Sequence, residues 1–118
     1  MLRNASAART DGCSRTASTT GGGLGNLDGV VALAGSILAN SLSGSDCAST
    51  PPVTDVGYNL VEDGSCGLPV GGDPALGILQ DNGGPTWTHA LLPGSPALDA
   101  IPAGACPLAT DQRGVERP

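Results

Sequence analysis

The stretch DNGGPTWTHALLPGSPALDA, residues 81–100, contains the only tryptophan and the only histidine of this 118-residue chain. On a β-strand the side chains of Trp87 and His89 would point to the same face, because they are two residues apart. An indole face suits the C–H face of a pyranose ring, which makes this pair a candidate glycan contact. The alternative is a capping strand whose tryptophan covers the end of an aliphatic core, since the chain has no phenylalanine. His89 as a catalytic base would need an acid or nucleophile partner that the sequence does not place, so we expect no catalytic residue.

Charged residues near the C-terminus predict an internal ion pair. An arginine side chain can donate two parallel hydrogen bonds to one carboxylate. We expect Arg113 to pair in this way with Asp99 or Asp111, while Gln112 donates to the backbone, so that the four residues clamp the C-terminal segment. The alternative is that Arg113 binds an anionic sugar.

The four cysteines are far apart in the sequence and include no C-x-x-C pair, which favours disulfides over a zinc site. Reduced structural thiols are the alternative. Cys47 and Cys66 would close a loop of about 20 residues, worth roughly 3 kcal/mol by chain entropy. Cys13 and Cys106 are the remaining pair. Disulfides persist in oxidising compartments, so this pattern predicts an extracellular or cell-surface protein.

The charge of the chain excludes several partners. The net charge is −6, and nine acidic residues but no lysine or arginine lie between Arg15 and Arg113. Such a surface repels phosphate backbones and anionic lipid, so we expect no nucleic-acid partner.

No apolar run is long enough for a membrane span, and no signal peptide opens this chain, so we expect no membrane insertion.

Metal binding is also not expected, and we predict no cofactor. The run GGLGNLD is close to a calcium-binding glycine-rich repeat, but Asp28 comes one residue too late for that register. The turns at 62–65 and 72–75 also contain carboxylates. Calcium at one of these loops is the alternative.

Period-2 patterns predict strands over 30–40, bent at Gly35, over 53–62 and over 75–79. One face of the first two would carry Val31, Leu33, Ile37, Ala39, Val56, Tyr58 and Leu60. The segments SILAN at 36–40 and YNLVE at 58–62 align with each other, each a short strand that leads into a polar loop. Strand-and-turn units of roughly 20 to 25 residues are typical of a parallel β-solenoid, although a small β-sandwich would also give short strands.

Longer motifs carry a resemblance to a known family. GGGLGN followed by VVALAGSILAN resembles the repeat of right-handed parallel β-helix proteins. GYNLVEDGSCG, GDPALGILQDNGGPTWTHALLPGSPALDA and TDQRGVERP, in this order, resemble the choice-of-anchor Q domain at the C-terminal end of secreted or surface β-helix proteins of bacteria. The sequence departs from the family at Ala100, which Ile101 follows in place of a glycine.

The resemblance implies an all-β fold, a right-handed parallel β-helix with a C-terminal cap. Residues 21–80 would be β-helix coils and residues 81–118 the cap. Residues 1–20 lie outside the resemblance, and their polar, non-periodic composition predicts a disordered or truncated lead-in. Within the family motif the tryptophan position varies, which favours the capping role of Trp87 over glycan contact.

The resemblance also implies a function, a non-catalytic structural or capping module of an adhesin-like protein. Its partners would be upstream β-helix coils of the parent protein, and glycans in addition. The alternative is a carbohydrate-binding or polysaccharide-degrading β-helix fragment, a lyase or hydrolase. Such enzymes need clustered acidic and basic residues on one face, whereas the acidic residues here are scattered through turns, so we expect no enzyme.

Overall fold

Glycines and prolines divide the chain into short strands and turns, and the computed structural model describes residues 8–11, 21–106 and 108–117. The chain forms two units, Met1–Pro74 and Ala75–Pro118. The strands of the first unit are β1 (Ala8–Asp11), β2 (Gly21–Leu27), β3 (Val30–Ala34), β4 (Ile37–Leu38), β5 (Ser45–Thr50), β6 (Thr54–Gly57) and β7 (Leu60–Val61). The second unit contains β8 (Leu76–Gln80) and β9 (Thr88–Leu91).

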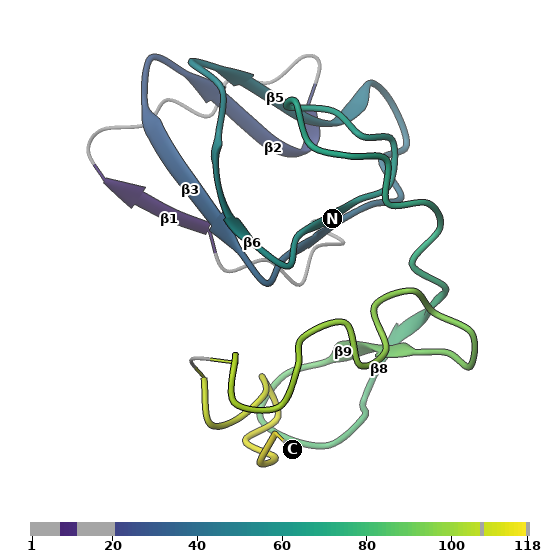
Figure 1. Ribbon diagram of the computed structural model, residues 1–118. Coiled ribbons are helices and arrows are strands. Elements are labelled where there is room, and N and C mark those ends of the chain that lie inside the picture. The colour runs from purple at the N-terminus through teal and green to yellow at the C-terminus, as the bar shows by residue number, and fades with distance from the viewer. Residues whose placement is uncertain (1–7, 12–20, 107, 118) are drawn as a thin grey trace. The chain divides into compact units, whose positions relative to one another are not determined.

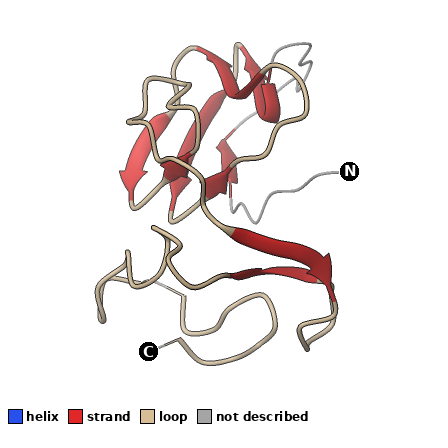
Figure 2. Cartoon of the chain, turned by 90° about the vertical axis from the view of Figure 1, so that its right-hand side faces the viewer, coloured by secondary structure: helices blue, strands red, loops and turns tan. Residues whose placement is uncertain are grey.

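Figure 2 draws the described chain as strands and loops only. The strand content predicted from the sequence is confirmed in this coarse sense, since the protein is rich in β structure. Among the described residues there is no helix of the length and apolar character needed to cross a membrane.

Three parallel pairs build the first unit: β2 with β5, β3 with β6, and β4 with β7. The partners are far apart in the sequence, as in Leu24 with Cys47 and Ile37 with Leu60. β1 pairs antiparallel with the other edge of β3 (Figure 1). Each parallel pairing therefore joins two strands that are separated in the sequence by other strands and turns.

The hydrophobic core lies inside the first unit. Its buried residues are Val31, Leu33, Leu38, Cys47, Val61 and Leu68. In β3 the exposed and buried positions alternate, which is the period-2 pattern of a half-buried strand. The core is therefore aliphatic, as a chain without phenylalanine requires.

The prediction of a right-handed parallel β-helix is wrong. The described strands are short, the parallel pairs are only two strands deep, and no solenoid forms. The sheet that contains β3 has an antiparallel edge strand, β1. A solenoid needs about three or more stacked repeats to bury its core, and this sequence supplies two sets of strands before the glycine- and proline-rich segment 63–74.

The predicted strand faces are also partly wrong, because positive φ angles break the strands. Gly35 has φ 54° and separates β3 from β4, and beyond it Leu38 enters the core in place of Ile37. Tyr58 has φ 57° and separates β6 from β7, so that Val56 and Tyr58 are exposed. The alignment of 36–40 with 58–62 is wrong by one position, since Ile37 pairs with Leu60 and not with its neighbour Asn59.

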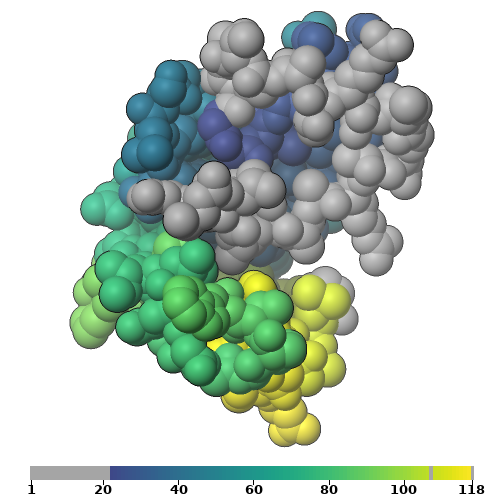
Figure 3. Space-filling model, turned by 180° about the vertical axis from the view of Figure 1, so that it is seen from behind, coloured from purple at the N-terminus to yellow at the C-terminus, as the bar shows by residue number. Residues whose placement is uncertain are grey.

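The second unit is built on an antiparallel hairpin of β8 and β9, in which Leu79 pairs with His89. Near the C-terminus, Thr110 and Glu116 form an antiparallel bridge, which makes 110–116 a second, smaller hairpin. Figure 3 shows this C-terminal segment in yellow beside green atoms of the second unit.

Candidate functional site

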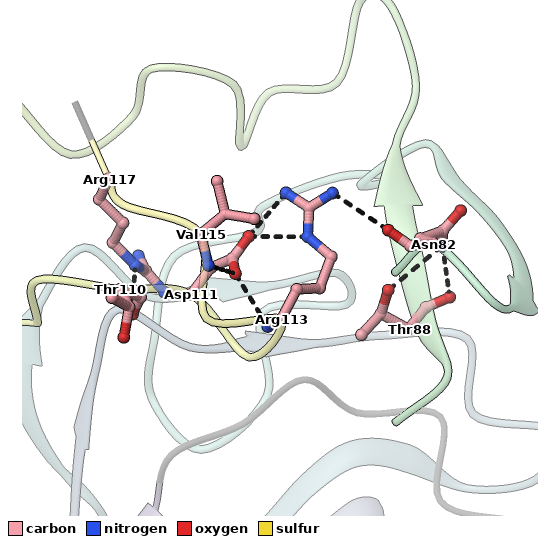
Figure 4. Close-up of polar contacts among 7 residues, drawn as sticks. All are labelled: Asn82, Thr88, Thr110, Asp111, Arg113, Val115 and Arg117. Carbon is pink, nitrogen blue, oxygen red and sulfur yellow. Dashed lines mark hydrogen bonds and ion pairs between the residues drawn. The ribbon is translucent and has the colours of Figure 1, made fainter. Parts of the chain in front are cut away.

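The C-terminal hairpin is organised by one carboxylate, that of Asp111 (Figure 4). Its Oδ2 accepts hydrogen bonds from Nε and Nη2 of Arg113 at 2.8 and 2.6 Å. Its Oδ1 accepts from the backbone N–H groups of Arg113 and Val115 at 2.8 and 3.1 Å. The Arg113 side chain, followed by these backbone donors, holds the pKa of Asp111 below the ordinary value of an aspartate.

Two side chains connect this hairpin to the loop between β8 and β9. Gln112 Nε2 donates to Thr86 Oγ1 at 2.8 Å, and Arg113 Nη1 donates to the Asn82 carbonyl at 3.5 Å. The structure therefore contains the ion pair of Arg113 with Asp111, one of the two predicted carboxylate partners. Gln112 bonds to a hydroxyl and not, as predicted, to the backbone. Asp99 is not part of it and forms no ion pair or hydrogen bond with the described residues.

The two ends of the β8–β9 loop are joined by hydrogen bonds from Asn82. Asn82 Nδ2 donates to the Thr88 carbonyl at 2.8 Å and to Thr88 Oγ1 at 3.2 Å. At the same end of the loop the Gly83 N–H donates to Asp81 Oδ1 at 2.9 Å. The loop that precedes Trp87 is thus fixed at its two ends by its own polar side chains.

The structure gives Trp87 and His89 different environments. Trp87 lies just before β9 and is 64% exposed. His89 Nδ1 lies 2.7 Å from the Gly77 carbonyl and donates to it, because that oxygen can only accept. His89 Nε2 is buried and has no partner among the described residues. His89 therefore supports the hairpin and does not accompany Trp87 on one surface.

Two adjacent glycines allow a matched test of how closely the C-terminal hairpin contacts this loop. Gly83 and Gly84 have φ 89° and 85°, so that alanine costs roughly 1–2 kcal/mol of backbone strain at either position. A Cβ at Gly84 would lie 2.6 Å from Arg113 Cα, whereas at Gly83 it would meet no atom. We expect Gly84→Ala to destabilise the second unit by about 1–3 kcal/mol more than Gly83→Ala. Urea unfolding followed by Trp87 fluorescence measures both, and equal losses would contradict the contact.

The first unit contains the only disulfide of the described residues, between Cys47 and Cys66, as predicted. The other predicted pair is Cys13 with Cys106. Cys106 is a free thiol whose Sγ lies 3.5 Å from Arg117 Nη1, and Cys13 lies outside the described residues.

Around the disulfide, two aspartates exchange hydrogen bonds with each other's backbone. The Asp46 N–H donates to Asp63 Oδ2 at 2.9 Å, and the Asp63 N–H donates to Asp46 Oδ2 at 3.2 Å. The Ser65 hydroxyl donates to Asp63 Oδ1 and accepts from the Cys47 N–H at 2.9 Å. The segment that carries Cys66 is therefore bonded to the strand that carries Cys47 by three polar side chains, which we call the aspartate lock (Asp46, Asp63 and Ser65).

The aspartate lock should make stability depend on pH. Burial raises the pKa of Asp63, but hydrogen bonds from the Ser65 hydroxyl and from the N–H groups of Asp46 and Ser65 outweigh it and lower the pKa below its ordinary value. Because the folded-state pKa is depressed, this stabilisation is complete above the unfolded-state pKa, about 4, and is lost as pH falls through the folded-state pKa.

We therefore expect the urea midpoint of the protein to fall between pH 6 and pH 3, and to fall less in Asp63→Asn. At pH 6 this variant should lose about 1 kcal/mol, since the amide replaces one acceptor oxygen by a donor. Asp99→Asn is the control, because this exposed carboxylate has no hydrogen bond to the described residues. The same pH dependence in Asp63→Asn and in the unaltered protein would refute this role.

Sequence reasoning missed the aspartate lock and two asparagines that hold turns. Asn26 accepts from the Gly29 N–H at 3.1 Å and donates to Ser49 Oγ at 3.0 Å. Asn59 donates to the Leu33 carbonyl at 2.8 Å and accepts from the Ser36 N–H at 3.0 Å. Asparagine and aspartate favour turns, but this preference does not identify a partner in a distant segment of the chain.

No group of three or more His, Cys, Asp or Glu side chains able to hold a metal ion is present in the described part of the chain. The turns at Asp28, 62–65 and 72–75 are not brought together into such a group. In the second of these turns the carboxylates accept hydrogen bonds from the backbone, for example Glu62 Oε2 from the Asn40 N–H at 2.7 Å.

No protein-family model, curated protein or solved structure matches this chain. The resemblance to the choice-of-anchor Q domain therefore stays a prediction from the sequence motifs.

Proposed function

We propose that this chain is a non-catalytic structural module of a secreted or cell-surface protein, where it holds a segment of β structure in one conformation and joins it to adjoining β structure of the same protein. The observation that carries this proposal is the Cys47–Cys66 disulfide together with the aspartate lock, which joins the same two segments of the chain. The motif resemblance to bacterial surface proteins supports the same role.

The chemistry of the polar side chains agrees with this role. Asp46, Asp63 and Asp111 each accept hydrogen bonds from backbone N–H groups of neighbouring turns. A carboxylate used in this way stabilises a turn. These three carboxylates are thus used to fix loops, two of them in the first unit and one in the C-terminal hairpin.

The proposal can be tested by comparing disulfide formation in an oxidising and in a reducing compartment. The chain would be produced in a bacterial host with and without an export signal, and its free thiols counted by maleimide labelling under denaturing conditions. We expect two fewer labelled thiols in the exported chain than in the cytoplasmic chain, and a longer survival in thermolysin, because the disulfide disfavours the unfolded chain.

The matched control is Cys106→Ala, which removes the free thiol and should leave thermolysin resistance of the exported chain unchanged. Equal labelling of the exported and cytoplasmic chains would refute the extracellular assignment. Equal survival with the bond formed would refute its structural role.

A further inference from the structure

We infer that Trp87 is a stacking platform for a neutral saccharide, a binding role that goes beyond the proposed structural function. An indole that is 64% exposed presents a flat apolar surface to solvent, at an energetic cost that a ligand would remove. A single exposed hydrophobic side chain is common on protein surfaces, so exposure by itself is not sufficient.

The anchoring of the neighbouring residues distinguishes Trp87 from an ordinary exposed side chain. Thr86, before it, accepts the hydrogen bond from Gln112, and Thr88, after it, accepts two from Asn82. The residues on both sides of the tryptophan are therefore held, Thr86 by a side chain of the C-terminal hairpin and Thr88 by a side chain of the same loop. With its neighbours fixed, Trp87 has chiefly its own two side-chain torsions to order when a ligand stacks on it, and this cost in conformational entropy is small.

The chemistry around the indole favours a sugar. The groups that flank Trp87 are amides and hydroxyls, from Asn82, Thr86, Thr88 and Gln112, and such groups exchange hydrogen bonds with sugar hydroxyls. The Arg113 guanidinium nearby is neutralised by Asp111 in the ion pair at 2.6 Å. With a net charge of −6 on the chain, a neutral ligand is favoured over an anionic one.

The test uses the fact that Trp87 is the only tryptophan of the chain, so that tryptophan emission reports this one residue. The full chain would be titrated with neutral hexasaccharides of β-1,4-glucose, β-1,4-xylose, β-1,4-mannose, β-1,4-N-acetylglucosamine and α-1,4-glucose. We expect a saturable change in emission and protection from acrylamide quenching with at least one of them. The absence of a saturable response to all five would overturn the inference.

Variants then connect the binding to the platform. By titration calorimetry we expect Trp87→Ala to weaken the affinity at least tenfold, Gln112→Ala to weaken it severalfold by freeing Thr86, and Trp87→Phe to retain part of it. Tyr58→Ala is the matched control, because Tyr58 is the other aromatic residue of the chain, is 53% exposed and lies in the first unit. Unchanged affinity in Trp87→Ala, or an equal loss in Tyr58→Ala, would overturn the inference. Thermolysin survival should stay the same in Trp87→Ala, which separates this result from a failure of the structural role.

Discussion

Replacing Cys47 and Cys66 together by alanine is expected to lower the free energy of unfolding of the first unit by about 3 kcal/mol or more. The two cysteines are 19 residues apart, and opening a loop of this length restores about 3 kcal/mol of conformational entropy to the unfolded chain. Cys47 is also buried in the hydrophobic core, so the alanine variant additionally loses packing at that position. Urea unfolding followed by far-ultraviolet circular dichroism would measure the change.

Reduction separates the two contributions, because it breaks the cross-link and leaves every side-chain carbon in place. We expect reduction of the unaltered protein to give most of the loss and the double variant to lose somewhat more. Cys106→Ala is the control and should change stability by less than about 0.5 kcal/mol, since Cys106 is not in a disulfide or in the core. A reduced protein as stable as the oxidised one would show that the cross-link contributes nothing.

Leu33→Ala is expected to be the most damaging single substitution in the first unit, at about 2–5 kcal/mol. Leu33 is 0% exposed and lies in the core cluster, so the truncation removes buried methyl groups and leaves a cavity among side chains with no aromatic residue to fill it. The matched control is Leu42→Ala, because Leu42 is 86% exposed and outside that cluster.

We expect Leu42→Ala to stay within about 0.5 kcal/mol of the unaltered protein. Both variants would be measured by urea unfolding at the same pH with the disulfide intact. Similar losses at the two positions would mean that the first unit is not organised around Leu33.

The sequence predicted individual elements better than their assembly. The pairing of Cys47 with Cys66 followed from their spacing, which is a local property. An ion pair of Arg113 was also predicted, but the sequence left Asp99 or Asp111 open as its partner, and the structure selects Asp111. The β-helix prediction depended on stacking many repeats, which a chain with two sets of strands does not do. The strand faces depended on unbroken alternation, and the positive φ angle at Tyr58 ends it.

The candidate site shows the same division. The motif around Trp87 and His89 indicated a strand between turns, and β9 begins directly after Trp87. It did not show that the imidazole of His89 bonds to Gly77 inside the hairpin while the indole of Trp87 remains exposed. Those environments depend on β8 and on the C-terminal hairpin, which come from other parts of the chain.

By itself, then, the sequence determined the aliphatic core composition, the acidic charge, the positions of turns and the better disulfide pair, because these depend on residue type and short-range spacing. Only the tertiary structure decided which distant strands pair, in which register, and how deep the sheets become. It also decided that Asp46 and Asp63 bond to each other's backbone and that Gln112 reaches Thr86. The physical reason is that a buried or strand-end N–H group must find an acceptor, but the acceptor is chosen by where bends at residues such as Gly35 bring distant segments together.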